Sequence, residues 1–435
     1  MRLAVAAALL FLAASSVAGA ATLRVPEDYA SVLAAVDAAV QGDSVLIGPG
    51  TWDDWEPQTH VYNGFSLTFG ANAFLKRGIT LVGTAGATST ILQAPESSAG
   101  AICAYPDSPS GVVRLVGLTL RGGGPECTGI RATGSGWIVL EDCVIEDGGL
   151  GVAIDRANLS MFRTVVRGRD GSAVGQSGIR AIGVDVRLED CTFEDNVAGS
   201  VLFVDGGLSS TTIRRCRFVN NIGSRMALVR EQYPLLIEDC WFEGNVSSGI
   251  STGFCLGVSN CEGDVRRNTF ANNRNTGHGA GVLSLSISNG EGPLAVYLNT
   301  VYGTLVASGS SGAGITMLGK EPYEFHSNIV AGCRGGPAVF REDLEPDPSE
   351  GCNVFWDNDS GEFDGYEPAP TDVVADPQFC DPASLDFTVS ASSVCAPGGI
   401  SGCGQIGAHG VGCGSVAVQP STWGRVKAGF RETRQ

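Results

Sequence analysis

A short phrase recurs from Trp137 to about Gly332 and constrains the fold more than any other feature of the chain. Four copies are centred on a cysteine: Glu141-Asp142-Cys143-Val144-Ile145, Glu189-Asp190-Cys191-Thr192-Phe193, Arg214-Arg215-Cys216-Arg217-Phe218 and Glu238-Asp239-Cys240-Trp241-Phe242. Weaker copies are centred on Thr164, Asn268, Asn299 and Asn328, and the spacing between centres is 21 to 31 residues. A repeat of this length with short β-type cores predicts a solenoid.

Two columns of the repeat indicate which side chains point inward. The central positions are occupied by Cys143, Thr164, Cys191, Cys216, Cys240, Asn268, Asn299 and Asn328. Two places later stand Ile145, Val166, Phe193, Phe218, Phe242, Phe270, Val301 and Val330. Side chains two apart on a strand share a face, so both columns are expected inside the solenoid. The buried asparagines would then need amide hydrogen bonds to neighbouring coils.

The position before the central column alternates in charge. It is occupied in turn by Asp142, Arg163, Asp190, Arg215, Asp239 and Arg267. Parallel neighbours lie about 4.8 Å apart, so opposite charges on successive coils attract. We expect an outward salt-bridge ladder that fixes the register of the coils. Arginines paired in this way do not form a strong polyanion-binding strip.

The N-terminal region has the features of a leader and a cap. Residues 1–20 combine Arg2, a short apolar run and a small-residue cleavage site, as in a secretory signal peptide. We expect a cap over residues 21–52, with a helix on the apolar positions Val32, Leu33, Val36, Ala39 and Val40 that ends at Gly42-Asp43. A helix over the open end of a β-solenoid would cover its unpaired strand edge.

Two segments resemble a known superfamily. The run Leu23-Arg24-Val25-Pro26-Glu27-Asp28-Tyr29, followed by Gly42-Asp43-Ser44-Val45 and Gly48-Pro49-Gly50-Thr51-Trp52, is similar to the opening of secreted bacterial proteins of the pectin-lyase-like superfamily. The segment Gly351-Cys352-Asn353-Val354-Phe355-Trp356, with Ala375-Asp376-Pro377-Gln378-Phe379-Cys380, resembles their closing region. The resemblance implies an all-β, right-handed parallel β-helix with an N-terminal helical cap, over residues 21–414, and export of the protein.

Cysteine usage suits an oxidising compartment. Cys143, Cys191, Cys216 and Cys240 occupy the central column and are expected to be small buried hydrophobes. The disulfide candidates are Cys103, Cys127, Cys255, Cys261, Cys333, Cys352, Cys380, Cys395, Cys403 and Cys413. Cys103–Cys127 and Cys255–Cys261 are the preferred local pairs. We predict no zinc site, because the chain has no CxxC pair or histidine cluster.

The C-terminal third changes character. Residues 341–414 are expected to form an acidic loop followed by Cys-rich closing coils. Calcium binding in this acidic region is an alternative to a solvated loop, although no EF-hand spacing is present. Residues 415–435 form a basic tail containing Trp423-Gly424-Arg425-Val426-Lys427, which resembles short C-terminal sorting or anchoring tags.

Composition excludes some function classes. The formal net charge is −18, which disfavours binding to nucleic acid. With 61 glycines and only 28 Lys plus Arg residues, tight turns are favoured over helices. The leader aside, no apolar run is long enough to predict a transmembrane segment. We expect a monomer with no cofactor other than the calcium just mentioned.

The search for an active site gives only isolated candidates. His278, Arg274, Arg215 and Asp239 are the catalytic candidates, with His278 as a proton shuttle. Trp137, Trp241, Asn245 and Asn273 are candidates for ligand binding, the tryptophans by stacking on sugars. Asn196, Asn221, Asn245 and Asn273 also form a column after the strand, which favours a turn ladder over a row of sugar-binding side chains. The group Trp52-Asp53-Asp54-Trp55-Glu56 either flanks a groove or covers the cap.

The scarcity of Lys and His favours a binding protein over an enzyme. We expect a secreted or surface-displayed protein that contacts extracellular carbohydrate or another polymer without catalysis. The alternatives are a polysaccharide lyase or glycoside hydrolase with its site on one face of the coils between residues 163 and 278, and a structural spacer or adhesin.

Overall fold

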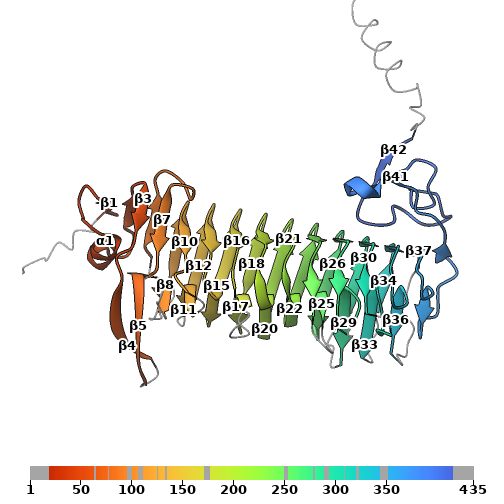
Figure 1. Ribbon diagram of the computed structural model, residues 1–435, viewed down its shortest axis with the longest axis horizontal. Coiled ribbons are helices and arrows are strands. Elements are labelled where there is room, and N and C mark those ends of the chain that lie inside the picture. The colour runs from red at the N-terminus through yellow and green to blue at the C-terminus, as the bar shows by residue number, and fades with distance from the viewer. Residues whose placement is uncertain are drawn as a thin grey trace, which may run out of the picture.

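The chain forms a right-handed parallel β-helix, seen in profile in Figure 1, as expected from the repeat. The computed structural model describes residues 19–62, 65–76, 78–95, 100–105, 111–124, 126–132, 135–170, 177–248, 253–277, 280–288, 293–307, 309–319, 323–342 and 351–414. Within these residues the only α-helix is α1 (Val32–Ala38). Each coil contributes strands to three walls, which are named here in the order in which a coil passes through them.

Wall 1 precedes the central column of the repeat. It contains β1 (Thr22–Val25), β2 (Ser44–Ile47), β6 (Thr80–Gly83), β9 (Val112–Val116), β12 (Gly136–Glu141), β15 (Ala157–Phe162), β18 (Val186–Glu189), the second halves of β20 (Val197–Arg214) and β22 (Ile222–Glu238), β26 (Gly263–Arg266), β30 (Leu294–Tyr297) and β34 (Tyr323–His326).

Wall 2 is a sheet of 13 short strands, all parallel and in register. It contains β3 (Gly50–Trp52), β7 (Thr90–Gln93), β10 (Thr119–Arg121), β13 (Val144–Glu146), β16 (Val165–Arg167), β19 (Thr192–Glu194), β21 (Arg217–Val219), β23 (Trp241–Glu243), β27 (Thr269–Ala271), β31 (Thr300–Tyr302), β35 (Ile329–Ala331), β37 (Val354–Trp356) and β39 (Val373–Val374).

Wall 3 completes the coil. It contains β5 (Phe65–Phe74), β8 (Gly100–Tyr105), β11 (Cys127–Ala132), β14 (Leu150–Asp155), β17 (Ser177–Ile182), the first halves of β20 and β22, β24 (Val246–Ser247), β25 (Phe254–Ser259), β28 (Arg274–Asn275), β29 (Leu283–Ile287), β32 (Leu305–Val306), β33 (Ile315–Gly319), β36 (Val339–Arg341) and β38 (Phe363–Asp364).

Both inward columns are confirmed. Phe193, Phe218, Phe242 and Phe270 are buried and stack on one another with ring centroids 4.6, 4.6 and 4.8 Å apart, close to the spacing of parallel strands. The four column cysteines are buried free thiols, and burial raises the pKa of Cys143 to about 12. These ladders form the apolar core along the axis of the solenoid.

Buried asparagines bond from coil to coil, as the central column requires. Asn268 donates through Nδ2 to Oδ1 of Asn299 at 3.0 Å, and Asn299 donates in the same way to Asn328. Each amide also donates to a main-chain carbonyl of the preceding coil, as Asn268 does to Ile237. The ladder therefore satisfies polar groups that would otherwise destabilise the interior.

The N-terminal cap is confirmed, with a shorter helix than expected. Ser31 accepts a hydrogen bond from the backbone N–H of Ala34, which places it at the N-cap of α1. The helix ends at Ala38, and Val40 is 60% exposed rather than part of an apolar face. An unexpected feature is the antiparallel hairpin of β4 (Glu56–Tyr62) and β5, which projects from the solenoid beside the cap (Figure 1).

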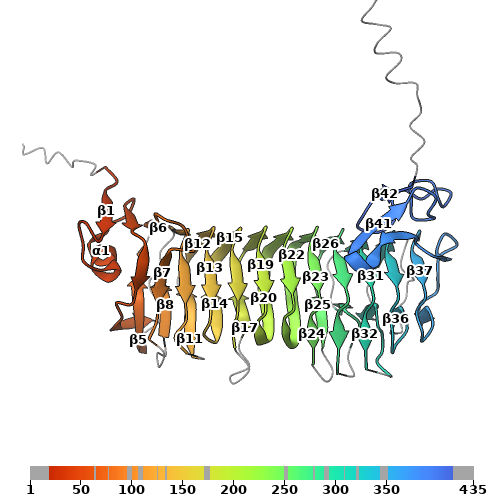
Figure 2. The ribbon, with the colours of Figure 1, turned by 45° about the horizontal axis from the view of Figure 1, so that its top comes forward.

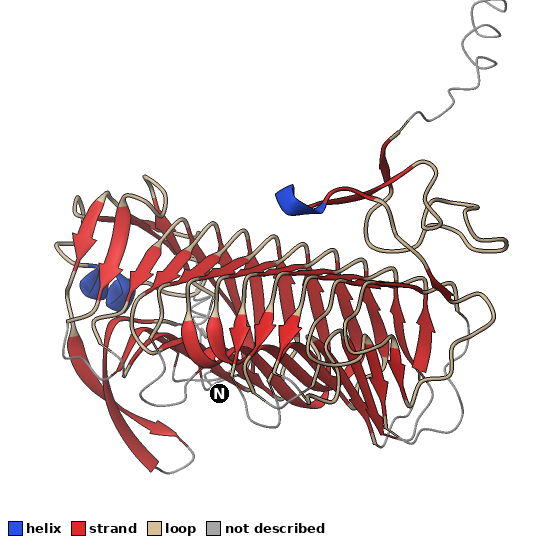
Figure 3. Ribbon diagram, turned by 45° about the vertical axis from the view of Figure 1, so that its right-hand side comes forward, coloured by secondary structure: helices blue, strands red, loops and turns tan. Residues whose placement is uncertain are grey.

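The end of the chain does not continue as further coils. Residues 375–414, the closing segment, contain a small sheet of β40 (Phe379–Asp381), β41 (Asp386–Ser390) and β42 (Val411–Cys413), and a 3-10 turn, η1 (Pro382–Ser384). This segment turns back along the solenoid, as Figures 2 and 3 show, and it packs on wall 2 at β23, β27 and β31. Its contacts include His409 Nε2 with Thr269 Oγ1 at 2.8 Å, and Ala408 N–H donating to Thr300 Oγ1 at 2.9 Å.

Two disulfides hold this end. Cys352 pairs with Cys403, which ties the last coils to the closing segment, and Cys380 pairs with Cys413 inside the segment. All four residues are among the predicted candidates. Their bonds join segments 51 and 33 residues apart, so they close long loops of the unfolded chain.

The preferred pairs Cys103–Cys127 and Cys255–Cys261 are wrong. All four residues are buried free thiols, as are Cys333 and Cys395. Cys127 lies opposite Gly100 in the neighbouring strand, three positions from Cys103, which is about 10 Å along the strand. Cys255 is near the start of β25, whereas Cys261 follows its end. Both pairs are thus too far apart for the about 4.4–6.8 Å between Cα atoms that a disulfide spans.

Candidate ligand-binding clefts

The alternating charge column is an ion-pair ladder, as predicted. Arg163 donates to both carboxylate oxygens of Asp142, at 2.7 and 2.9 Å, Arg215 does so to Asp190, and Arg267 to Asp239. The hydrogen bonds from these arginines lower the pKa of each partner aspartate. Two catalytic candidates, Arg215 and Asp239, therefore lie in one ladder, where each already holds a partner.

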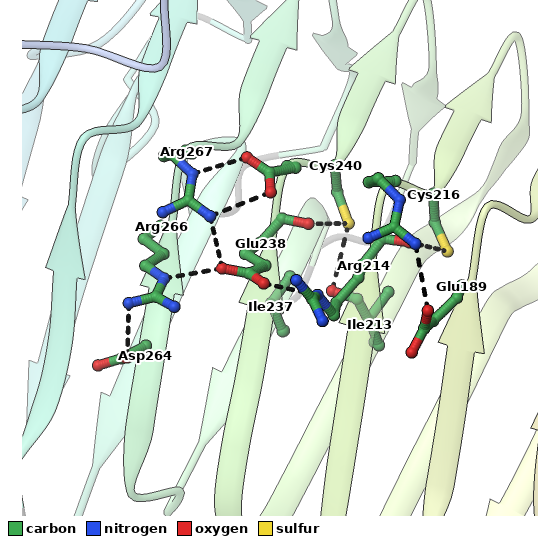
Figure 4. Close-up of polar contacts among 12 residues, drawn as sticks. Glu189, Ile213, Arg214, Cys216, Ile237, Glu238, Cys240, Asp264, Arg266 and Arg267 are labelled. Carbon is green, nitrogen blue, oxygen red and sulfur yellow. Dashed lines mark hydrogen bonds and ion pairs between the residues drawn. The ribbon is translucent and has the colours of Figure 1, made fainter.

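Glu238 is the most enclosed carboxylate of this surface. It is only 2% exposed, although it lies on the outer side of wall 1. Arg214, Arg266 and Arg267 converge on it, with nitrogen to oxygen distances of 2.6, 2.9 and 2.6 Å (Figure 4). Arg266 also donates to the hydroxyl of Tyr297 at 2.6 Å. Charge is thus compensated within the cluster, and no carboxylate in it has the free, desolvated environment of a general acid.

The other two catalytic candidates are not part of this cluster. Arg274 is exposed in β28, on the opposite side of wall 2 from the ladder. His278 lies outside the described residues. The structure therefore brings Arg215 and Asp239 together and leaves Arg274 apart.

Two of the four predicted ligand-binding side chains are buried, and a third packs against the closing segment. Asn245 and Asn273 are at most 1% exposed and belong to a second interior ladder, so they are not available to a sugar. The indole of Trp241 lies against Phe387 and His409 of the closing segment, 5.9 and 5.7 Å between ring centroids. Trp137 is half-buried on wall 1. The turn-ladder interpretation of the asparagines holds, and the ladder is internal rather than exposed.

One edge of the solenoid, between walls 2 and 3, repeats a left-handed turn residue in successive coils. We call it the turn edge; it consists of Asp147, Gly168, Asp195, Asn220, Gly244, Asn272, Gly303, Gly332 and Asp357, all with φ between 53° and 68°. Only Gly, Asn and Asp occur there, because these residues adopt this conformation at least cost. Both cavities described below open on this edge.

The larger cavity, the N-terminal groove, has a volume of about 1060 Å³. Its floor is made mainly of backbone, at Gly122, Gly123, Gly124, Gly148 and Gly168. Its polar wall residues are Asp53, Gln93, Arg121, Asp147 and Asp170. Asp53 comes from the Trp-rich group after the first coil, whereas Trp52 and Trp55 of that group pack against the apolar core.

Arg121, the cationic residue that lines the groove, already forms an ion pair. Arg121 Nε donates to Glu146 Oε1 at 2.7 Å, and Arg167 donates to the other oxygen at 2.8 Å. Burial of Glu146 opposes ionisation, but these two arginines keep its pKa below the ordinary value. The remaining charges of the wall are carboxylates, so the groove favours uncharged or cationic groups over anions.

Arg169 is buried directly below the groove. Its Nη2 donates to the carbonyls of Leu150 and Cys127 at 2.6 and 3.3 Å, and burial lowers its pKa to about 10. A Cβ at Gly148 would come within 3.0 Å of this nitrogen, so glycine is the residue that leaves room for it. Arg169 occupies the column of the interior asparagines and begins their ladder, because its backbone N–H donates to Asn196 Oδ1.

The smaller cavity, the aromatic cleft, has a volume of about 360 Å³ and lies between the turn edge and the closing segment. Tyr302 and Trp356 line it from wall 2, and Phe379 lines it from β40. Trp356 is 41% exposed, the only tryptophan among the large exposed apolar side chains of the described residues. Tyr302 packs edge-to-face on Phe379, with centroids 5.7 Å apart.

Polar groups surround the aromatic side chains. Arg334, Asp357, Asp376 and Gln378 complete the lining with Pro377 and Pro382. Arg334 donates to Asp357 Oδ2 at 2.6 Å, and this contact raises the pKa of Arg334. The guanidinium is thus paired, and Asp376 adds a further carboxylate. An aromatic platform beside several hydrogen-bonding groups suits a hydroxylated ring.

Sequence reasoning did not select this cleft. Trp356 could have been selected by alternation, because Phe355 continues the inward column and its neighbour must face outward. Phe379 and Gln378 gave no such signal, since they reach the cleft only because the closing segment folds back.

Metal-binding clusters and membrane-spanning helices are both absent from the described residues. No group of three His, Cys, Asp or Glu side chains in this part of the chain is placed to hold a metal ion. No helix within it is long and apolar enough to cross a membrane.

The family model for a right-handed β-helix region matches residues 128–291. The match agrees with the observed fold, a right-handed parallel β-helix. The resemblance to the pectin-lyase-like superfamily is therefore confirmed at the level of the fold. No curated protein matches the sequence.

Solved structures with a similar arrangement include enzymes that act on polysaccharides. The mannuronan C-5 epimerase A-module of Azotobacter vinelandii is 14% identical, with a TM-score of 0.39 over 77% of this chain and 91% of that one. The family 28 exopolygalacturonase of Yersinia enterocolitica is 11% identical, with a TM-score of 0.37 over 80% and 79%. Pectate lyase Pel9A is 13% identical, with a TM-score of 0.31 over 87% and 90%. At these values no residue of the β-helix protein inherits a role from them.

Proposed function

We propose that this β-helix protein binds an uncharged extracellular carbohydrate in the aromatic cleft and does not change it chemically. The observation that carries this proposal is the exposed indole of Trp356, set beside Tyr302 and within reach of Gln378 and Asp376. Aromatic rings stack on the apolar faces of sugars, while amide and carboxylate oxygens bond their hydroxyls. The volume of the cleft, about 360 Å³, is at the lower end of the range of small-ligand sites.

The electrostatics of the cleft support an uncharged sugar. Arg334 is paired with Asp357, and Asp376 lies on the same wall, so negative charge dominates the lining. A uronate would bring its own carboxylate against these groups, and the net charge of −18 on the chain would add to the repulsion.

Binding without catalysis is supported by the ion pairs that the charged catalytic candidates already form. A general base or acid needs a shifted pKa and access to substrate. In the ladder, Arg215 and Asp239 each hold a partner, and Glu238 is shielded by three arginines. Their arrangement serves the register of the coils.

An extracellular location is part of the proposal. The two disulfides Cys352–Cys403 and Cys380–Cys413 suit an oxidising compartment. The predicted leader at residues 1–20 would provide the route of export; residues 1–18 of it lie outside the described residues.

A glycoside hydrolase is the second candidate, favoured by one observation. Three carboxylates, Asp53, Asp147 and Asp170, line the N-terminal groove, and most glycoside hydrolases act through a pair of carboxylates that flank the bond to be cleaved.

One experiment separates the two candidates. The mature protein is incubated with panels of neutral and uronic-acid polysaccharides, with calcium and with EDTA, while unsaturated products, reducing ends and retention on the glycan are followed. We expect retention on a neutral glycan and no product. Reducing ends without unsaturated products would establish the hydrolase, and unsaturated products would establish a lyase. Absence of both product and retention would leave a spacer or adhesin.

A further inference from the structure

The two cavities open on the same edge of the solenoid. The N-terminal groove takes Asp147 and Gly168 from the turn edge, and the aromatic cleft takes Gly303, Gly332 and Asp357 from it. Because the strands of wall 2 are in register from β7 to β37, this edge follows the axis of the solenoid without a register shift in wall 2. A linear ligand bound in one cavity and parallel to the axis therefore points at the other.

The span between the cavities follows from the number of coils. Seven steps of wall 2 separate β13, at the groove, from β35, at the cleft. At about 4.8 Å per parallel neighbour this is roughly 34 Å.

The part of the edge between the cavities is polar and accessible. Asp195, Asn220 and Asn272 are exposed there. Each asparagine directs its amide oxygen over the glycine of the next coil, since a Cβ at Gly244 would meet Asn220 Oδ1 at 2.6 Å, and one at Gly303 would meet Asn272 Oδ1 at 2.6 Å. The edge thus presents carboxylate and amide groups in a row, the kind of groups that hydroxyls bond.

We propose that a single uncharged glycan chain lies along the turn edge and occupies the N-terminal groove and the aromatic cleft at the same time. This inference rests on the proposed function, because it takes the cleft as a carbohydrate site. The groove adds a second site with a different character: a glycine floor, which lets a polymer approach the backbone closely, and polar walls without an aromatic residue.

Simultaneous occupation has a measurable consequence. Once one end of a chain is bound, the other end meets its site at a high effective concentration, and the combined affinity exceeds that of either site by about 10²–10⁴-fold. The gain appears only when the chain is long enough to span the roughly 34 Å between the sites.

The test is a length series of the neutral oligosaccharide that the full-length protein retains, titrated by calorimetry. Short chains are expected to bind weakly, and chains longer than the span at least tenfold more tightly with one chain per protein. Trp356→Ala and Asp147→Ala, one from each cavity, should each bring the long chain back to short-chain affinity. Arg187→Ala, exposed on wall 1, is the matched control and should keep the gain.

Each other outcome has a definite meaning. Equal affinity for short and long chains overturns the two-site inference, and so does a gain in affinity that survives both cavity variants. In either case the proposed function is upheld if Trp356→Ala loses the binding of short chains. Absence of binding at every length overturns both. Circular dichroism and thermal midpoints of the variants show whether each variant is folded, so that a loss of the long-chain affinity is not mistaken for unfolding.

Discussion

The side-chain Nδ2 of Asn221 lies 3.0 Å from Oδ1 of Asn245 in the next coil, and both side chains are fully buried. Asn245 repeats the contact with Asn273, and its Nδ2 also donates to the carbonyl of Phe218 at 2.8 Å. From the sequence alone, the same asparagines could also form a sugar-binding row. Their burial shows instead that one amide per coil satisfies main-chain groups at the corner between walls 2 and 3.

Replacing Asn245 by Ala should destabilise the solenoid. The substitution removes the partners of the Asn221 backbone N–H and of the Phe218 carbonyl, while Asn221 Nδ2 keeps its bond to the carbonyl of Phe193. Each unsatisfied group costs about 1–3 kcal/mol. We expect a loss of about 2–4 kcal/mol in the free energy of unfolding, measured by urea denaturation. The control is Asn220→Asp on the exposed turn edge, which should change stability by about 0.5 kcal/mol at most. Equal effects of the two variants would contradict the internal ladder.

Exchanging the charges of Asp190 and Arg215 tests the outer ladder. Arg215→Glu alone places a third carboxylate beside Asp190 and Glu189, which Arg215 now binds at 2.7 and 3.1 Å. Because the pair is exposed, the expected loss in the free energy of unfolding is about 0–1 kcal/mol. The double variant Asp190→Arg/Arg215→Glu should recover only part of this loss, as measured by a double-mutant cycle, because the exchanged charges face like charges at Arg163 and Asp239 in the flanking coils. A double variant as unstable as the sum of both single changes would argue against a direct pairing.

The repeat made the solenoid, its inward columns and its charge ladder predictable, because each depends on residues at fixed offsets within one coil. The folding back of the closing segment was not predictable in this way. It depends on contacts such as that of His409 with Thr269, which are 140 residues apart and follow no period. The aromatic cleft was missed for the same reason, since part of its wall comes from that segment. The disulfide pairing likewise follows from this arrangement and not from proximity in sequence.

We predict that His409 makes the docking of the closing segment sensitive to pH. Its ring packs against those of Trp241 and Phe387, and burial lowers its pKa, against the opposing effect of Asp386. The docked state therefore favours the neutral ring. Docking should be at full strength above the ordinary histidine pKa of about 6.5 and should weaken as the pH falls through the lowered value. Tryptophan fluorescence and limited proteolysis between pH 7.5 and pH 4.5, chosen as roughly bracketing that value, would record the change. His409→Gln should remove most of the pH dependence of docking in this range. An unchanged pH profile in this variant would show that other groups cause the dependence.

Reduction of the disulfides should release the closing segment. Cys352–Cys403 and Cys380–Cys413 close loops of 51 and 33 residues, so each contributes about 4 kcal/mol in the chain-entropy account. We expect that Cys352→Ser/Cys403→Ser gives early protease cuts in the segment while the circular dichroism of the solenoid persists. The buried thiol Cys395 provides the control, because Cys395→Ser removes a cysteine of the same segment without breaking a disulfide. Loss of the whole β-helix in the double variant would show instead that the solenoid depends on this bond.

The proposed function depends most directly on Trp356. Calorimetric titration of a neutral oligosaccharide into the wild-type protein, Trp356→Phe and Trp356→Ala measures its part in binding, and a matched uronate oligosaccharide in EDTA measures the discrimination by charge. Stacking on an aromatic ring is worth about 1–3 kcal/mol when it is removed, so we predict at least a fivefold loss of affinity in Trp356→Ala, partial recovery in Trp356→Phe and no uronate binding. Unchanged affinity in Trp356→Ala, or tighter binding of the uronate, would contradict the account.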